Sequence, residues 1–247
     1  MENEPKTNGV LTHKRIVILG GSSGIGLATA KAAVGEGANV IIVSSNQQRI
    51  SAALELLPAE SSGFSVDLSK EENIKTFFEQ VGNFDHLIYT AGENISMNMM
   101  EDMDIEQAKS FLNIRFWGAL SAIKYGKAHL NEGGSITLMS GSFGHRPSKG
   151  YSLGASICGA MDAFTRAMAV ELAPIRVNNI AAGVIRTNLW DGLSEEDRNG
   201  FYKYMEDASL LKRIGEPEDI AQAFIYLMKQ PHTTGQSLLI DGGSVLV

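Results

Sequence analysis

A glycine-rich segment that directly follows an apolar run constrains this chain more than any other feature of its sequence. Residues 15–26 read RIVILGGSSGIG, the pattern of a buried strand, then a turn, then the start of a helix. Gly20 permits a tight turn, Gly24 lets the backbone approach a pyrophosphate, and Gly26 allows the helix to pack closely on the strand. Free N–H groups and the positive dipole end of the helix favour phosphate there. The segment therefore predicts a dinucleotide-binding strand–turn–helix unit.

Short apolar runs alternate with longer amphipathic stretches along the rest of the chain. Seven runs are predicted to be strands: 16–19, 40–43, 63–66, 86–90, 135–139, 177–181 and 237–240. Helical patterns lie between them, at 25–36, 71–81, 105–129, 157–172 and 217–228. Strands that are apolar on both faces, each followed by a helix, indicate a parallel sheet covered on both sides. We therefore expect one α/β domain over residues 14–247, with a doubly wound seven-stranded parallel sheet.

The chain ends and the composition exclude several classes of protein. Residues 1–13 are polar and are expected to form a flexible tail, because they lack the apolar run of a signal peptide. No stretch is apolar enough to span a bilayer, so we expect a cytoplasmic protein without a membrane partner. A net charge of −7 argues against nucleic acid as a partner. The single cysteine, Cys158, excludes an internal disulfide and a cysteine-based zinc cluster, and no metal site is predicted.

Motifs in the first half of the chain resemble those of the short-chain dehydrogenase/reductase family. The three residues between Gly20 and Gly24 match the family's T-G-x-x-x-G-x-G, with Leu19 in place of the threonine. The sequence YTAG at residues 89–92 is similar to the family's N-N-A-G, with both asparagines replaced.

Further motifs follow in the family's order in the second half. Residues 176–187, RVNNIAAGVIRT, resemble R-V-N-x-(I/V)-x-P-G-x-(I/V)-x-T, with Ala182 in place of the proline. IDGG at residues 240–243 matches the end of the family's last strand. The resemblance extends over residues 14–247. It implies a Rossmann-type fold and a homo-oligomer, a tetramer or dimer, with the apolar residues 245–247 at an interface.

The resemblance also implies which groups contact a nicotinamide cofactor. The expected contacts are Gly20, Ser22, Ser23, Gly24, Ile25, Gly26, Ser44, Ser45, Asn46, Arg49, Asp67, Leu68, Thr90, Ala91, Gly92, Gly183, Ile185 and Thr187. NAD-specific sites usually carry an acid after the second strand, to bind the ribose 2′-OH. Ser44 stands there instead, and Asn46 and Arg49 are suited to binding a 2′-phosphate. We therefore expect NADP(H) in preference to NAD(H), although a merely polar loop is the alternative.

The catalytic pattern of the family is missing. Its members reduce a carbonyl with a serine, a tyrosine, a lysine four residues after the tyrosine, and an asparagine. Counting back from Glu171 at the family's spacing places Gly154 at the tyrosine position and Cys158 at the lysine position. Gly141 falls at the serine position and Arg115 at the asparagine position. At each of these four positions the chain therefore carries a different type of residue from the one that the family uses.

Four residues are catalytic candidates: Arg115, Tyr151, Ser140 and Ser142. Arg115 either forms a structural salt bridge or clamps a substrate carboxylate or carbonyl, and it cannot be a general acid at neutral pH. Tyr151 either packs at a helix start or points into the cleft. Cys158 is interpreted as a small buried helix residue rather than a nucleophile. His145, in the loop after the fifth strand, is a possible substitute acid in a region where most polar residues are solvated.

Residues 188–210 are expected, by resemblance, to form a lid over the substrate. Aromatic and sulfur side chains in this lid favour an apolar or aromatic substrate: Trp190, Phe201, Tyr202 and Met205. A methionine group either lines the same cleft or packs against neighbouring helices or a second subunit: Met97, Met99, Met100 and Met103.

The expected function is an NADP(H)-dependent oxidoreductase with a non-standard active site, acting on a small molecule. Loss of the proton donor typically lowers a rate by about 10²–10⁴ where proton transfer is needed. An iminium accepts hydride without prior protonation, and a conjugated C=C acceptor is protonated later by water, so a C=O, C=N or conjugated C=C group is expected. The alternative is a non-redox isomerase or cyclase, or a cofactor-sensing binding protein, on the same fold.

Overall fold

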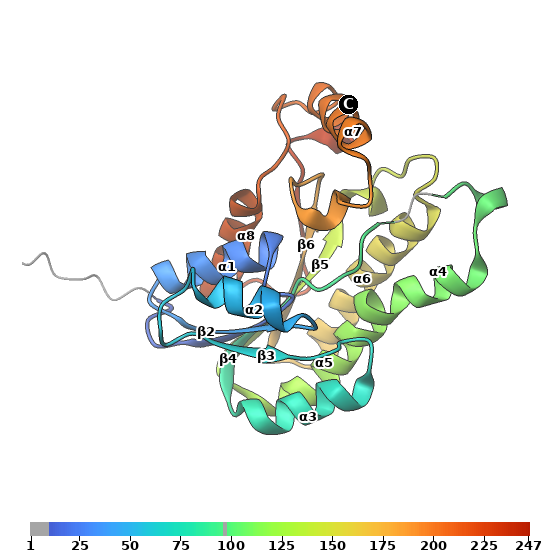
Figure 1. The fold of residues 1–247 in the computed structure, drawn as a ribbon. Helices are drawn as coiled ribbons and strands as arrows, with labels where there is room; N and C mark the ends of the chain where they lie inside the picture. The colour runs from blue at the N-terminus through green and yellow to red at the C-terminus, as the bar shows by residue number, and fades with distance from the viewer. Residues whose placement is uncertain (1–9, 96–97) are drawn as a thin grey trace, which may run out of the picture.

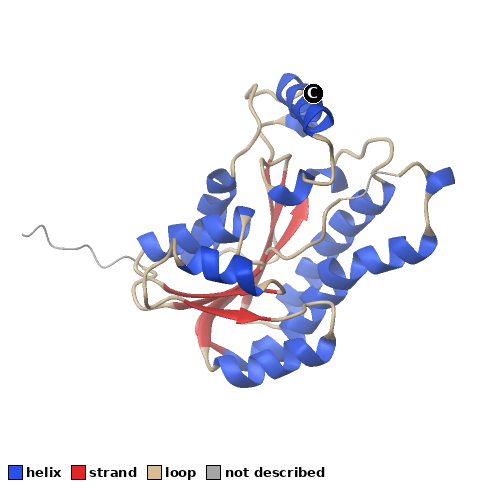
Figure 2. Ribbon diagram, viewed as in Figure 1, coloured by secondary structure: helices blue, strands red, loops and turns tan. Residues whose placement is uncertain are grey.

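The structure, a computed structural model, describes residues 10–95 and 98–247. Seven parallel strands form one sheet in the order β3-β2-β1-β4-β5-β6-β7, which confirms the predicted doubly wound sheet (Figures 1 and 2). Their bounds are β1 Arg15–Leu19, β2 Asn39–Ser44, β3 Ser62–Ser65, β4 Phe84–Tyr89, β5 Leu130–Gly141, β6 Arg176–Ala182 and β7 Ser237–Ile240.

Helices cover both faces of this sheet, as Figure 1 shows. Their bounds are α1 Gly24–Gly35, α2 Gln47–Leu54, α3 Glu71–Val81, α4 Ile105–Leu112, α5 Ala119–Gly126, α6 Ser152–Glu171, α7 Glu195–Asp207 and α8 Pro217–Lys229. Side chains alternate along each strand, so Ile16 and Ile18 pack with α1, α2 and α8, whereas Val17 and Leu19 pack with α3, α5 and α6. Both faces are therefore buried, which explains the continuous apolar runs in the sequence. No helix in the described part of the chain is long and apolar enough to cross a membrane.

The packed part of the chain begins earlier than predicted. Leu11 is buried in the core beside α1 and α8, and the backbone N–H of His13 donates to the carbonyl oxygen of Gly37 at 2.9 Å. The predicted tail over residues 1–13 is therefore wrong for Leu11 to His13. Residues 1–9 of that tail lie outside the described residues.

Two helices differ from their predicted bounds in ways that affect the site. The single helix expected over 105–129 is interrupted by a wider, π-helical turn at Asn113–Gly118, which carries Arg115. Such turns are frequent at functional sites. The hydroxyl of Tyr89, at the end of β4, donates to the carbonyl oxygen of Ile114 at 2.5 Å and so ties this turn to the sheet. Helix α6 begins at Ser152 rather than Ile157, which places Gly154 in its first turn.

Candidate active site

A cavity of about 290 Å³ lies where the strand order reverses, beyond the carboxyl ends of β1 and β4. Crevices at this position of an open α/β sheet are where such folds bind ligands. Gly20 follows β1 and Thr90 follows β4, and both residues line the cavity. The two chain segments lie so close that a Cβ atom on Gly20 would stand 2.6 Å from the backbone nitrogen of Ala91. Glycine is therefore required at position 20.

The glycine-rich turn presents free backbone N–H groups to this cavity. The first helical hydrogen bond of α1 runs from the N–H of Leu27 to the carbonyl oxygen of Ser23 at 3.1 Å. Gly24, Ile25 and Gly26 precede that bond and line the cavity. Their N–H groups, at the positive end of α1, suit the pyrophosphate of a dinucleotide.

Most of the predicted cofactor contacts line this one cavity, and two do not. The side-chain oxygen of Asn46 caps α2 by accepting from the backbone N–H of Arg49 at 2.9 Å. The carboxylate of Asp67 accepts from the N–H and the hydroxyl of Ser69, at 3.0 and 2.6 Å. Both side chains are held by local hydrogen bonds outside the cavity lining, so the prediction that they face the ligand is not supported.

The charge of the cavity lining is opposite to that of the whole protein. Arg49 and Arg115 are the charged residues among the described residues that line it, and none of these is an aspartate or a glutamate. Ser44 and Ser45, after β2, lie in the same lining as Arg49. An acidic protein thus has a cavity suited to an anionic ligand.

Arg115 forms an ion pair and also lines the cavity, so it has the structural role, and its predicted role as a clamp for substrate stays a prediction. Its Nη2 donates to the backbone carbonyl of Glu93, and its Nε lies 4.0 Å from the Glu93 carboxylate. The guanidinium also lies over the ring of Phe111, 4.9 Å from its centroid. Burial lowers the pKa of Arg115 and raises the pKa of Glu93. Glu93 was missed by the sequence reasoning, and its position directly after Gly92 was the available signal.

Tyr151 also satisfies both of its predicted readings. It stands at the N-cap position of α6, 7% exposed, and its ring stacks on Phe143 with centroids 4.1 Å apart. It lines the cavity, and its hydroxyl has no hydrogen-bond partner among the described residues. Burial raises the pKa of Tyr151 to about 12. At neutral pH the residue is a hydrogen-bond donor rather than a phenolate.

The two candidate serines have different environments. Ser140 lines the cavity, but its hydroxyl donates to Asp162 at 3.0 Å and accepts from the side-chain amide of Asn179 at 2.8 Å. Ser142 is buried and is not part of the cavity lining, so its predicted place in the site is not supported. His145 lies 3.7 Å from the other carboxylate oxygen of Asp162, and it too lies outside the lining. The Asp162 network joins α6 to the sheet and was not foreseen from the sequence.

The two residues that the family's spacing assigns to the missing tyrosine and lysine lie at the cavity. Gly154 and Cys158 both line it. A Cβ atom on Gly154 would meet nothing within 4 Å, so the space for a side chain is open. Cys158 is a buried core residue, and burial raises the pKa of its thiol. The thiol therefore stays protonated at neutral pH.

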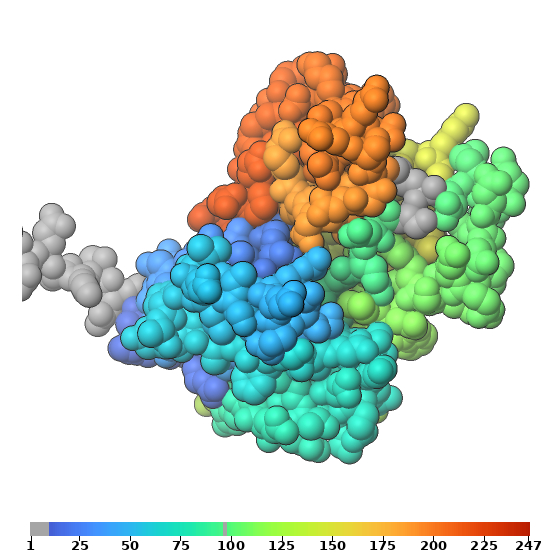
Figure 3. All heavy atoms as spheres, in the orientation of Figure 1, coloured from blue at the N-terminus to red at the C-terminus, as the bar shows by residue number. Residues whose placement is uncertain are grey.

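The predicted lid contributes less to the cavity than expected. It consists of a short helical turn at Asn188–Trp190 and α7, and it forms a separate lobe in the space-filling view (orange in Figure 3). Trp190 lines the cavity, whereas Phe201, Tyr202 and Met205 pack with it in a hydrophobic cluster that also contains Val184 and Ile214, and these three lie outside the cavity lining. Their predicted contact with substrate is therefore not supported.

The methionines after β4 do not line the cavity either. Met99 and Met100 are exposed, and Met103, half-buried, also lies outside the cavity lining. Met97 lies outside the described residues. The methionines were predicted either to line the cleft or to pack against neighbouring helices or a second subunit. For the three methionines that the structure describes, the first of these alternatives is not supported.

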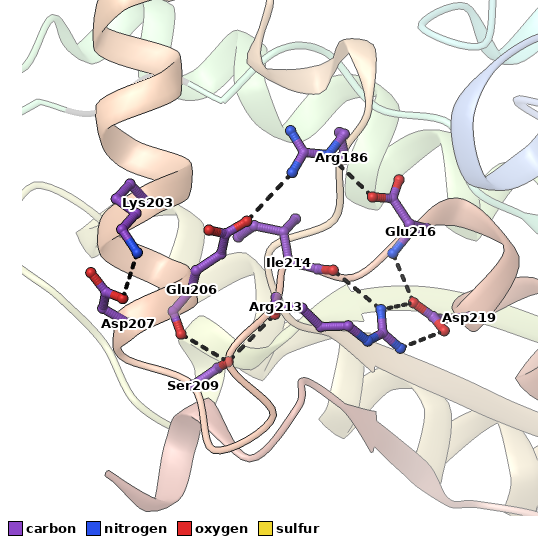
Figure 4. A network of polar contacts seen from close by, with 9 residues as sticks. All are labelled: Arg186, Lys203, Glu206, Asp207, Ser209, Arg213, Ile214, Glu216 and Asp219. Carbon is purple, nitrogen blue, oxygen red and sulfur yellow. Dashed lines mark hydrogen bonds and ion pairs between the residues drawn. The ribbon is translucent and has the colours of Figure 1, made fainter.

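Ion pairs fasten the base of the lid to the start of α8 (Figure 4). Arg186 contacts Glu206 of α7 at 3.6 Å and Glu216, the N-cap residue of α8, at 3.1 Å. Arg213 donates to both carboxylate oxygens of Asp219, at 2.6 and 2.8 Å. These contacts connect the end of α7 and the loop after it to the body of the molecule.

Comparison with known proteins identifies relatives over almost the whole chain. The family described as Enoyl-(Acyl carrier protein) reductase matches residues 20–244. The short-chain dehydrogenase/reductase ATR9 of Stachybotrys chlorohalonatus is 41% identical over 249 residues, which cover 94% of this chain and 96% of that protein.

Solved structures show the same architecture. A small-chain dehydrogenase in complex with NADPH superposes with a TM-score of 0.86 at 34% identity, covering 95% of this chain and 100% of the other. The reductase/Diels-Alderase MalC from Malbranchea aurantiaca has a TM-score of 0.88 at 28% identity, covering 96% and 97%.

Proposed function

This chain belongs to the short-chain dehydrogenase/reductase family, and on that basis we propose that it is an NADP(H)-dependent oxidoreductase with a non-standard active site. The observation that carries the proposal is the charge of the cavity, in which Arg49 lies with Ser44 and Ser45 and no described lining residue is acidic. A ribose 2′-phosphate is dianionic, so a carboxylate beside it would repel it and a guanidinium attracts it. The NADPH-bound relative supports the same choice.

Different residues of the cavity lining would bind the different parts of this cofactor. Ser22, Ser23 and the N–H groups at the start of α1 would hold the pyrophosphate. Leu68 and its neighbour Val66 would flank the adenine, because both line the cavity beside the end of β3. By family resemblance, Gly183, Ile185 and Thr187 would contact the nicotinamide end. When bound, the nicotinamide would supply or accept a hydride.

The substrate would occupy the part of the cavity beyond Gly92. Arg115 and Tyr151 offer hydrogen-bond donors there, and Phe143 and Trp190 offer aromatic surface. This lining favours a small apolar or aromatic molecule with an oxygen acceptor. Oxidoreduction of such a molecule is the function that we propose.

Two titrations and one screen test this proposal. We expect NADPH to quench the fluorescence of Trp190 and to bind at least about tenfold more tightly than NADH, a difference of about 1.4 kcal/mol. NADPH oxidation, followed by absorbance, is then measured with a ketone, an imine and an enone. Failure of both cofactors to bind would contradict the proposal.

A non-redox activity on the same fold is the second candidate. The tyrosine and lysine positions hold Gly154 and Cys158, so the family's proton donor is absent, and one structural relative is named both a reductase and a Diels-Alderase. Tight NADPH binding without turnover of any of the three acceptors would favour a cyclase, an isomerase or a cofactor sensor.

We also propose a homo-oligomer, because large apolar side chains are exposed on the long helices and at the C-terminus. Trp117, in the π-helical turn, is 54% exposed, Val170 of α6 is 83% exposed and Leu246 is 76% exposed. Burial of such side chains against a second copy would be favourable. Light scattering after gel filtration measures the mass, and a monomer at micromolar concentration would contradict this proposal.

A further inference from the structure

A buried carboxylate lies behind the wall of the cavity. Asp162, on α6, is 9% exposed and is not part of the cavity lining. Among the described residues, no lysine or arginine forms an ion pair with it. A buried charge is costly unless it is paired with an opposite charge and hydrogen-bonded. The carboxylate of Asp162 is therefore a candidate for function rather than a contribution to stability.

The contacts of this carboxylate connect it to the cavity. The hydroxyl groups of Ser140 and Ser237 donate to its Oδ1 at 3.0 and 2.8 Å, and the side-chain amide of Asn179 donates at 2.6 Å. Its Oδ2 lies 3.7 Å from Nε2 of His145, whose side chain is 40% exposed. Of these four described partners, only Ser140 lines the cavity. Ser140 therefore connects Asp162 to a ligand, and His145 connects it to solvent.

The hydrogen bonds of Ser140 restrict what its hydroxyl group can offer to a ligand. A serine hydroxyl has one proton and two lone pairs. Its proton goes to Asp162, because a carboxylate cannot donate, and the amide of Asn179 donates to one lone pair at 2.8 Å. The second lone pair can only accept. A ligand group beside Ser140 must therefore donate a hydrogen bond, as the hydroxyl of an alcohol does and a carbonyl oxygen does not.

We propose that Ser140 takes the proton of a substrate hydroxyl group and that Asp162 positions Ser140 and receives the proton that it gives up. This inference rests on the proposed oxidoreductase function, and none of the residues involved stands at a position of the family's catalytic pattern. The substrate O–H bond breaks and its proton moves to Ser140, while the proton of Ser140 moves to Asp162. A C=O bond forms as the carbon that bears the oxygen gives up a hydride to NADP⁺, which becomes NADPH. His145 takes the proton from Asp162 after rotation of its exposed side chain and releases it to water, so one hydride and one proton leave each alcohol.

A binding measurement tests the free lone pair of Ser140 without turnover. Phenol and anisole carry no hydrogen on the ring carbon that bears oxygen, so neither can lose a hydride there, and only phenol donates a hydrogen bond. By calorimetry, with and without NADP⁺, we expect phenol to bind about fivefold more tightly than anisole, in line with one hydrogen bond. Ser140→Ala should abolish this preference. Ser237→Ala removes another hydrogen bond to the same carboxylate from outside the cavity lining and should retain it. A wild type without the preference, or its equal loss in both variants, would overturn the inference.

Oxidation of 1-phenylethanol with NADP⁺, followed by the absorbance of NADPH, tests the proton transfer. We expect Ser140→Ala and Asp162→Asn to lower kcat by about 10²–10⁴, the range typical of a lost general base. The wild type should react more slowly in D₂O than in H₂O, and Ser237→Ala should keep this solvent isotope effect, which a structural defect alone would not alter. Ser140→Ala leaves the other two donors to Asp162 in place, so it remains informative if Asp162→Asn fails to fold.

These rates separate the inference from the function on which it rests. If a ketone, an imine or an enone oxidises NADPH but 1-phenylethanol does not reduce NADP⁺, the inference is overturned while the oxidoreductase proposal stands. The same holds if Ser140→Ala oxidises the alcohol at the rate of the wild type. No turnover in either direction would overturn both.

The role of His145 is tested by chemical rescue. We expect His145→Ala to lower kcat at least about tenfold and imidazole in the buffer to restore it, because free imidazole can carry the proton to water. His232→Ala removes an exposed histidine outside the cavity lining, and its rate should not respond to imidazole. Failure of imidazole to restore His145→Ala would overturn the assignment of His145 as the proton outlet.

Discussion

The guanidinium of Arg115 lies against the backbone of Gly92, so closely that a Cβ atom on Gly92 would stand 2.7 Å from the Cζ of Arg115. Arg115 comes from the π-helical turn that precedes α5, and Gly92 from the loop after β4. The absence of a side chain at position 92 thus gives the cation access to the edge of the cavity. The lack of a side chain at Gly92 therefore determines where the guanidinium of Arg115 can lie.

Gly92→Ala is expected to displace the guanidinium of Arg115. The new Cβ atom would stand 2.7 Å from the Cζ of Arg115, which is closer than van der Waals contact allows. We expect a loss of about 1–3 kcal/mol in the free energy of unfolding, typical of overpacking, measured by urea denaturation. The control is Gly35→Ala on α1, where a new Cβ meets nothing within 4 Å, and which should be neutral or stabilising. Equal stability of the two variants would refute the close contact.

Ser44→Asp is expected to reverse the cofactor preference. A carboxylate at the end of β2 would accept from the ribose 2′-OH of NADH and repel the 2′-phosphate of NADPH. We expect the ratio of the two dissociation constants to shift by at least about tenfold, equivalent to about 1.4 kcal/mol. Ser62→Asp, at the opposite end of β3 from the cavity, adds the same charge and should leave the ratio unchanged. An unaltered ratio in Ser44→Asp would show that the 2′-substituent lies elsewhere.

The double variant Gly154→Tyr/Cys158→Lys is expected to gain ketone reduction. The site of the new tyrosine is open, and both positions line the cavity. An ammonium near a phenol lowers its pKa, which supplies the missing acid, and general acid catalysis is worth about 10²–10⁴ in rate. Gly159 also has open space but does not line the cavity, so Gly159→Tyr/Cys158→Lys is the matched control. NADPH oxidation with an aryl ketone measures both, and equal rates would contradict the assignment of position 154.

Acidification is expected to destabilise the protein through His86. This residue, on β4, is buried beside the hydroxyl of Ser135 at 2.8 Å, and burial lowers its pKa to about 4. The unfolded chain, with an ordinary histidine pKa near 6.5, binds this proton first, so stability is present above about pH 6.5 and falls toward about pH 4. The shift corresponds to at most about 3 kcal/mol.

Urea denaturation between pH 7 and pH 4.5 measures this effect in wild type and in His86→Gln. We expect the variant to be less stable at pH 7 but to lose less stability on acidification. His232→Gln removes an exposed histidine and should keep the wild-type slope. A His86→Gln slope equal to that of wild type would assign the acid sensitivity to other groups.

The sequence by itself determined the parallel sheet, the approximate positions of its strands and the strand–turn–helix unit around the glycine-rich turn. These features are local: the apolar runs at β1 and β2 and the glycines between residues 20 and 26 follow from side-chain periodicity and backbone conformation over a few residues. The order of family motifs also indicated that Gly154 and Cys158 occupy the positions of the absent tyrosine and lysine. The assignments of Gly154 and Cys158 needed only the number of residues between them and Glu171 along one helix.

Only the tertiary structure decided which of the candidate side chains meet. Arg115 contacts Glu93, 22 residues away along the chain, because a π-helical turn, and not a regular helix, carries it to the loop after β4. Trp190 reaches the cavity while Phe201 packs beside it outside the cavity lining, and Leu11 packs into the core although Val10, next to it in the sequence, is exposed. These outcomes depend on how distant segments pack, and the free energy of that packing is not encoded in any short stretch of residues.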